Sequence, residues 1–297
     1  MLGILDKPEY FFSPQQIARR FAFRPREEQV DVRLPWGLVI RVHPGETIGR
    51  SCCTLGLYDL PVTEAIFRLL DEGETAVDAG ANIGHMTAAM VRRTGPSGRI
   101  FCFEPSEQIF AELESNIARW APYASIQAEQ CALSSVSGDG ELRIPESFRS
   151  NRGVATLERG MASVATERVA LRRLDDYMAA ATRIGVMKVD VEGHELELLR
   201  GCSEMLGQRI RDIIFEEQRP YPSEVHVYLE ERGYKVFRLD RGFWRPLLRP
   251  PESRPRRPYL PSNFLATTAE DRARERFRAF GWQALRRAPA FTNRSPA

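Results

Sequence analysis

Residues 77–84, Val-Asp-Ala-Gly-Ala-Asn-Ile-Gly, decide the fold of this chain. They complete a predicted strand at residues 74–80 and open a predicted helix, the context in which a glycine-rich turn is informative. Gly80 permits a sharp turn and a close backbone approach to a ligand, and Gly84 lets the helix start pack near the strand. Asn82 stands where a second glycine is common, and asparagine tolerates left-handed backbone angles.

The next apolar strand, residues 99–105, carries the second part of the signal. It ends at Glu104, 24 residues after Gly80. A spacing of about 20 residues is typical of an acidic side chain that accepts both hydroxyls of a bound ribose. Strand, glycine turn, helix, strand and terminal glutamate together predict a nucleoside site, and a structural turn without a ligand is the alternative.

Asp78 indicates which nucleoside is expected. A dinucleotide fold places a pyrophosphate on the helix N-terminus, and a carboxylate just before the first glycine would repel it. Asp78 suits a ligand with a cationic amino group, such as the methionine end of S-adenosylmethionine. The pattern therefore favours a methyl donor over NAD.

The rest of the chain alternates short apolar strands with helical patterns. This alternation predicts an α/β fold with a doubly wound, mostly parallel sheet and right-handed crossovers. The expected strands are residues 74–80, 99–105, 124–133, 184–193, 212–218 and 234–239, and the expected helices are residues 62–71, 85–94, 106–120, 194–206 and 223–232.

Two regions depart from this alternation before residue 240. Residues 1–60 are expected to form an N-terminal cap with a β-hairpin, because residues 29–35 and 38–43 alternate around a Trp-Gly turn. Residues 61–240 are expected to be the Rossmann-like domain. The alternation of strands and helices is interrupted at residues 137–175, whose pattern predicts short edge strands inserted on the sheet.

Residues 241–297 are expected to be a basic, Arg- and Pro-rich extension that is not regular for long. They hold 13 Arg against four acidic residues, so this segment is +9 in a chain of net charge +2. A last strand is expected at residues 262–267 and an exposed helix at residues 269–287. The segment either meets an anionic partner or is a solvated surface. Aromatics among its arginines (Phe243, Trp244, Tyr259) either stack on nucleic acid or pack in loops.

Residues 188–194, Lys-Val-Asp-Val-Glu-Gly-His, form a second constellation. Strand alternation puts Lys188, Asp190 and Glu192 on one side, and such a charged face needs partners or a ligand. Either the carboxylates belong to a site, or Asp190 or Glu192 caps the following helix. His194 is either an exposed residue of the first helical turn or a general base.

Lys188 is notable because all but three of the 42 basic residues are Arg. A lysine is a compact point charge whose pKa shifts readily on burial. Lys188 is expected either to hold Asp190 ionised or to accept a proton itself.

Glu216 and Glu217 close the next strand, and neighbouring strands are only ~5 Å apart. One of them is expected to face Asp190. Proton transfer, a divalent metal and pairing with Arg or Lys all remain open for these carboxylates.

Several motifs together resemble a known family. They are VDAGANIGHMTAAM (77–90), FCFEPSEQIFAELESNI (101–117), CALSS (131–135), LDDYM (174–178), MKVDVEGHELELLRG (187–201) and IIFEEQ (213–218). The chain resembles the FkbM-type methyltransferases, class I S-adenosylmethionine-dependent O-methyltransferases, from about residue 40 to 239. The basic tail is not covered.

The resemblance implies a donor site built from several loops. Glu104 would take the ribose, and the 131–133 loop would border the adenine. Asp190 would lie beside the sulfonium and the acceptor. The implied cofactor-binding residues are Asp78, Ala79, Gly80, Ala81, Asn82, Gly84, Glu104, Pro105, Cys131, Ala132 and Asp190, and the expected catalytic residues are Asp190, Lys188, Glu216 and His194.

The expected function is methyl transfer from S-adenosylmethionine to a hydroxyl of a sugar, polyketide or other small alcohol, with S-adenosylhomocysteine as product. An RNA 2′-O-methyltransferase and a non-catalytic nucleoside-binding module are the alternatives. No metal is expected to be required, because no cluster has the ligand count of a dedicated site. The five unpaired cysteines, the lack of a secretion signal and the lack of a long apolar run indicate a cytoplasmic protein without a membrane span. A nucleic-acid partner is not expected, and a homodimer is left open.

Overall fold

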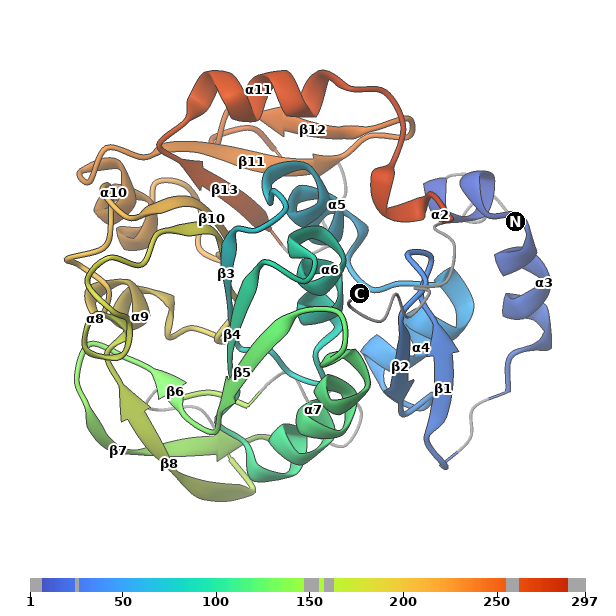
Figure 1. The fold of residues 1–297 in the computed structure, drawn as a ribbon, viewed down its shortest axis with the longest axis horizontal. Coiled ribbons are helices and arrows are strands. Elements are labelled where there is room, and N and C mark those ends of the chain that lie inside the picture. Colours follow the sequence, from blue (N-terminus) through green and yellow to red (C-terminus); the bar gives the residue numbers. More distant parts are fainter. Residues whose placement is uncertain (1–6, 25–26, 147–154, 158–162, 255–261, 288–297) are drawn as a thin grey trace, which may run out of the picture.

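The structure is a computed structural model that describes residues 7–24, 27–146, 155–157, 163–254 and 262–287. An eight-stranded sheet in the order β12-β11-β13-β10-β9-β3-β4-β5 forms its centre (Figure 1). The strands are β3 (Thr75–Ala79), β4 (Arg99–Phe103), β5 (Ser125–Glu129), β9 (Ile184–Val189), β10 (Ile210–Glu216), β11 (Lys235–Arg241), β12 (Pro246–Arg249) and β13 (Asn263–Thr267).

The pairing confirms the predicted α/β class with a mostly parallel, doubly wound sheet. β3 pairs in parallel with both β4 and β9, and β10 pairs in parallel with β9. β12 and β13 run opposite to the other six strands, so the pairings of β10 with β13, of β13 with β11 and of β11 with β12 are antiparallel. The chain starts in the middle of the sheet at β3 and builds outward in both directions, so a topological switch lies between β3 and β9.

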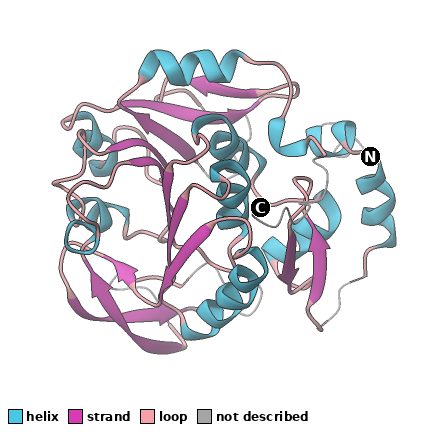
Figure 2. Cartoon of the chain, viewed as in Figure 1, coloured by secondary structure: helices cyan, strands magenta, loops and turns pink. Residues whose placement is uncertain are grey.

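Helices cover both faces of this sheet (Figure 2). The α-helices of the described residues are α2 (Pro8–Phe12), α3 (Gln15–Ala22), α4 (Thr47–Leu55), α5 (Leu60–Leu69), α6 (His85–Thr94), α7 (Glu107–Trp120), α8 (Leu174–Tyr177), α9 (Glu195–Arg200), α10 (Glu224–Glu230) and α11 (Glu270–Arg278). α5, α6 and α7 share one hydrophobic cluster, and α9 and α10 share another on the opposite face. Because successive side chains of a strand point to opposite faces, the strands contribute residues to both clusters. In β4, Cys102 belongs to the first cluster and Phe103 to the second.

Local signals explain most helix boundaries. The helix predicted at residues 85–94 is confirmed without change. α5 begins at Leu60, two residues before the prediction, because the Asp59 carboxylate accepts the Val62 N–H as an N-cap. The helix predicted at residues 194–206 is too long. α9 ends at Arg200, where Gly201 packs so closely on Ser134 that a Cβ would lie 1.9 Å from its carbonyl oxygen.

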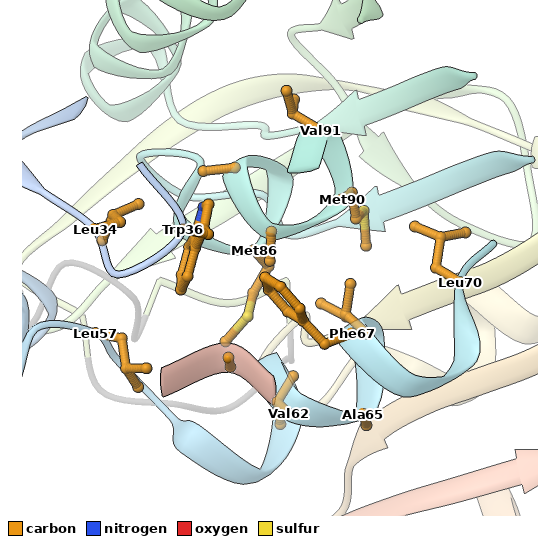
Figure 3. Close-up of a cluster of buried hydrophobic side chains, with 14 of the residues drawn as sticks. Leu34, Trp36, Leu57, Val62, Ala65, Phe67, Leu70, Met86, Met90 and Val91 are labelled. Carbon is orange, nitrogen blue, oxygen red and sulfur yellow. The ribbon is translucent and has the colours of Figure 1, made fainter. Parts of the chain in front are cut away.

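The predicted N-terminal hairpin is confirmed. β1 (Val30–Arg33) and β2 (Val39–Val42) pair in antiparallel register. Figure 3 shows Leu34 and Trp36, which join these strands, beside Phe67 of α5 and Met86 of α6. The cap therefore shares one hydrophobic core with the helices on its side of the sheet, and α2, α3 and α4 complete it.

The strands predicted at residues 137–175 do not lie on the edge of the central sheet. β7 (Gly138–Ile144) and β8 (Ala165–Arg172) form a separate three-stranded sheet with β6 (Ala132–Leu133). Seven residue pairs join β7 to β8, and β6 adds two residues to the other side of β8. Between β7 and β8 along the chain, Thr156 forms an isolated antiparallel bridge with Arg143, and residues 147–154 and 158–162 lie outside the described part.

The boundary expected after residue 240 differs from the structure, which continues the central sheet beyond it. β13 lies between β10 and β11, and β12 extends the sheet past β11. The strand predicted at residues 262–267 is therefore confirmed, but as an interior strand. Its residues are all buried because two neighbours flank it.

The helix expected at residues 269–287 is shorter and less exposed than predicted. α11 ends at Arg278, with Ala273 and Phe277 buried. Arg272 and Arg276 both form ion pairs with Asp71 at the end of α5. These contacts tie the basic segment to the body of the protein. Tyr259, an aromatic residue expected in this segment, lies outside the described residues.

Among the described residues, no helix is long and apolar enough to cross a membrane.

Candidate active site

A cavity opens at the carboxyl ends of the central strands. Its space amounts to about 1060 Å³, open mouth included. One wall comes from the loops after β3, β4 and β5, and another from the loops after β9 and β10. Leu142 and Leu157 of the three-stranded region close a further side. This is the position at which open α/β sheets bind their ligands.

The glycine turn after β3 forms the floor of this cavity. Gly80 has a φ of +72°, and a Cβ there would lie 1.9 Å from the carbonyl oxygen of Asp190. Glycine is thus required at position 80 because the backbone there packs closely against the loop after β9. The sequence instead suggested a close approach to a ligand. A Cβ on Gly84 would meet Leu113 and Trp120, so this glycine serves the packing of α6 on α7.

Asn82 and Glu104 are joined across the turn. Asn82 adopts a φ of +49°, as expected for an asparagine in a glycine position. Its backbone N–H donates to Glu104 Oε2 at 3.0 Å, and the Ser106 N–H donates to Glu104 Oε1 at 3.1 Å. Burial raises the pKa of Glu104 to about 7 despite these bonds. Both carboxylate oxygens are fixed by backbone donors and retain lone pairs at the cavity wall.

Asp78 does not line the cavity. Its side chain is fully buried, and Oδ2 accepts a hydrogen bond from Thr87 Oγ1 at 2.7 Å. Its other oxygen, Oδ1, lies 3.6 Å from Lys188 Nζ. The expectation that Asp78 meets a cationic ligand directly is therefore replaced by an internal ion pair, because β9 places a lysine in front of it.

Lys188 is the central cation of the site. Its Nζ donates to Gly80 O at 2.7 Å and lies 3.4 Å from Asp190 Oδ2. Burial alone would lower its pKa, but Asp190 and Asp78 outweigh burial and raise it. Of the two roles expected for Lys188, the raised pKa argues against accepting a proton, and the geometry supports an ion pair with the Asp190 carboxylate.

The loop after β9 carries Asp190 and Glu192 on the cavity wall. Neither residue caps the helix, because α9 has His194 at its N-cap position without a side-chain cap bond. The Gly193 N–H instead donates to Glu195 Oε1. Glu192 has a φ of +50°, and its pKa is raised to about 7 by burial and by Asp190. The capping alternative is thus wrong for both residues.

Glu216 and Glu217 point in different directions. Glu216 lines the cavity, because the register of Phe215 with Val189 carries it alongside Asp190. Burial raises its pKa to about 8, with Asp190 and Glu192 adding to the shift. The Glu217 carboxylate instead accepts hydrogen bonds from Arg219 and Ser223. Glu216 is therefore the member of this pair that faces Asp190.

His194 also lines the cavity, half-buried, with Nε2 3.0 Å from Ser134 Oγ. It is therefore less exposed than a free first-turn residue, and burial lowers its pKa. Pro105, Cys131 and Ala132 line the wall beside Phe103. Ala81 lies there with the glycine turn, whereas Ala79 ends β3 as a buried strand residue.

Sequence reasoning missed two polar residues of the cavity, Tyr58 and His85. Tyr58 precedes α5, and its backbone N–H donates to His85 Nε2 at 3.2 Å. Burial, together with Asp59 and Asp190, strongly raises the pKa of Tyr58, so its phenol stays protonated. Burial lowers the pKa of His85 to about 3. No local periodicity signals either role, since only the tertiary fold brings residues 56–59 to the strand ends.

Among the residues that the structure describes, no group of three or more His, Cys, Asp or Glu side chains is arranged to hold a metal ion. A glycine turn, a buried glutamate after the second strand and an acidic loop after the fourth surround one cavity. The fold around this cavity is a mixed α/β fold with a large, mostly parallel central sheet. The family model described as the methyltransferase FkbM domain matches residues 78–236, and the chain belongs to this family.

Individual relatives agree with the family. Methyltransferase sdnD of Sordaria araneosa is 30% identical over 200 residues, which cover 57% of this chain and 76% of that protein. Hexuronic acid methyltransferase AglP of Haloferax volcanii is 33% identical over 167 residues, which cover 53% of this chain and 63% of that protein. The crystal structure of methyltransferase FkbM from Methylobacillus flagellatus KT aligns with a TM-score of 0.43 and 16% identity, over 65% of this chain and 43% of that one.

Proposed function

We propose that this methyltransferase transfers a methyl group from S-adenosylmethionine to a hydroxyl oxygen of a small molecule. The observation that carries the proposal is a single cavity with two chemically different walls. Glu104 and the glycine turn form one wall, and Asp190 and Glu216 form the other. A nucleoside fits the first wall and an acceptor fits the second.

The residues of the first wall suit the donor. Glu104 is oriented by two backbone N–H groups, and its remaining lone pairs would accept the ribose hydroxyls. Cys131, Ala132 and Pro105 offer an apolar surface for the adenine. Asp190, which pairs with Lys188, would face the positively charged end of the donor. When bound, the donor supplies an electrophilic methyl group on a sulfonium.

The residues of the second wall would handle the acceptor. Asp190 would accept a hydrogen bond from a second hydroxyl of the acceptor and so direct the reacting oxygen toward the methyl group, and positioning of this kind supplies much of the rate enhancement in such reactions. Glu216 would take the hydroxyl proton as the new C–O bond forms. Its raised pKa of about 8 makes it a stronger base than an ordinary carboxylate, near the pH at which general bases work best.

A sugar or natural-product alcohol is the proposed acceptor class. One relative is named as a hexuronic acid methyltransferase, which supports a sugar hydroxyl. The phenol of Tyr58 and the carboxylates of Asp190 and Glu216 provide the donors and acceptors that a polyhydroxyl compound requires.

Calorimetry with S-adenosylhomocysteine and with NAD tests the donor part of this proposal. We expect micromolar binding of S-adenosylhomocysteine and a raised melting temperature, because a ligand specific for the folded state stabilises it. Binding of NAD without binding of S-adenosylhomocysteine would overturn the proposal. Transfer of labelled methyl groups to a panel of methyl glycosides and uronic acids would then define the acceptor.

A further inference from the structure

An aromatic patch forms where three distant segments of the chain meet. Phe11 comes from α2, Phe243 and Trp244 from the turn between β11 and β12, and Phe280 from the stretch after α11. Phe11, Trp244 and Phe280 are 55%, 47% and 67% exposed. Figure 1 shows α2 beside the C-terminal segment, and none of these rings lines the catalytic cavity.

The rings of the patch contact one another. The centroids of Phe11 and Trp244 are 5.1 Å apart at 90°, and those of Phe243 and Trp244 are 4.8 Å apart at 83°. Phe280 stacks on Trp244 at 5.8 Å and 25°. Three neighbouring exposed aromatic side chains form a continuous apolar surface, which on a soluble domain marks an interaction site.

The patch lies in a basic stretch of surface. Residues 8–24, 242–246 and 276–282, which carry or adjoin the rings, hold six arginines and one carboxylate. That carboxylate, Glu9, is buried in an ion pair with Arg241 and does not offset the exposed charge. The exposed cations of these segments are Arg19, Arg20, Arg24 and Arg278.

The chemistry of the patch favours a lipid surface over two other occupants. Stacking on nucleic-acid bases needs open ring faces, and the contact between Trp244 and Phe280 already covers one face of each ring. A second copy docked by two-fold symmetry would bring like-charged arginines together. Exposed Trp and Phe side chains in segments that also carry exposed arginines are what an anionic membrane interface binds, with the rings at the headgroup level and guanidinium groups on the phosphates.

We propose that the patch of Phe11, Trp244 and Phe280 docks the protein on an anionic lipid surface. This inference is independent of the proposed acceptor and donor. It gives the exposed arginines of these segments a partner, since arginines near an anionic surface add a favourable electrostatic contribution to the burial of the rings.

Intrinsic fluorescence tests the proposal directly. Trp244 is the only exposed tryptophan of the four, because Trp36, Trp120 and Trp282 are each 1% exposed. Full-length protein is mixed with vesicles of phosphatidylcholine, or of phosphatidylcholine with about one third phosphatidylglycerol. We expect a shift of the emission to shorter wavelength and co-sedimentation with the anionic vesicles, at least about tenfold tighter than with the neutral ones.

Variants distinguish vesicle binding through the patch from nonspecific binding. The double variant Phe11→Ser, Phe280→Ser should lose at least about tenfold in vesicle affinity and keep its melting temperature, because both rings are largely exposed. Val227→Ser is the matched control, because Val227 is an exposed apolar residue of α10, a helix that Figure 1 shows on the opposite side of the molecule from α2. No emission shift with anionic vesicles, equal binding to neutral ones, or unchanged binding of the double variant would overturn the proposal. Binding of an RNA oligomer to the patch, or a dimer formed through the patch in a sedimentation experiment, would also overturn the proposal.

Discussion

Lys188 Nζ lies 2.7 Å from the carbonyl oxygen of Gly80, so a side chain of β9 holds the glycine turn that follows β3. The same ammonium lies between two carboxylates, 3.6 Å from Asp78 and 3.4 Å from Asp190. One buried cation therefore joins the turn proposed to hold the donor to the carboxylate proposed to meet the acceptor. A group in this position fixes geometry on both sides of the cavity.

Lys188→Arg should lower turnover at least tenfold, about 1.4 kcal/mol of barrier, because the larger guanidinium does not fit the space between Gly80 and the two carboxylates. S-adenosylhomocysteine binding should change much less, since Glu104 is untouched. Steady-state kinetics and calorimetry measure the two effects. Lys235→Arg, at an exposed position of β11, is the control that should behave like wild type. Full activity of Lys188→Arg across pH 6–9 would show that the lysine is only structural.

Glu104→Gln should weaken S-adenosylhomocysteine binding by roughly 1.5–3 kcal/mol, the range for a hydrogen bond to a charged group. The amide retains the size of the side chain but has only one acceptor oxygen for two backbone N–H groups. Titration calorimetry gives the affinity, and Glu107→Gln at the exposed start of α7 is the control. An unchanged affinity would remove Glu104 from the donor site.

Glu216→Gln should alter how stability depends on pH. The folded protein raises the pKa of Glu216 to about 8, whereas an unfolded glutamate titrates near ~4.3. Between these values the folded state retains a proton that the unfolded state releases, so the free energy of unfolding falls as pH rises. In the variant, residue 216 does not titrate, so this fall in the free energy of unfolding is absent. We therefore expect the variant to melt at a higher temperature than wild type at about pH 9, with little difference at about pH 4. The same difference in melting temperature between variant and wild type at both pH values would contradict the raised pKa of Glu216.

Glu64→Ala should destabilise the fold by about 3–5 kcal/mol, because it leaves the buried guanidinium of Arg68 without its partner. Glu64 also accepts the backbone N–H groups of Gln283 and Ala284, so the C-terminal segment should become sensitive to protease. Glu270→Ala breaks the exposed pair with Arg274 and should cost no more than about 0.5 kcal/mol. Denaturant titration compares the two, and equal costs would argue against the buried pair.

Chelation should leave the enzyme unaffected. Asp190 and Glu216 share the cavity with Lys188, whose positive charge disfavours a divalent cation beside Asp190. EDTA should therefore change neither the melting temperature nor methyl transfer. Loss of turnover in EDTA that Mg²⁺ or Mn²⁺ restores would show that these carboxylates bind a metal.

Short-range patterns predicted the elements that local chemistry controls. The hairpin of β1 and β2 and the helix α6 follow from alternation and from the glycine turn, and the structure has them where expected. Glu104 was found because the βαβ unit fixes how far a second strand end lies from the first glycine. These features depend on residues that are close in sequence or connected by one crossover.

The sequence by itself determined the α/β class, the glycine turn and the strand ends at which Asp190 and Glu216 lie. Only the tertiary structure decided that Lys188 stands between Asp78 and the cavity, that Tyr58 reaches the site, and that β13 completes the sheet between β10 and β11. Alternation along a strand fixes which residues share a face, but it does not fix which strands become neighbours or what covers them. Those choices depend on burying the whole core at once, including strands that are distant in the sequence.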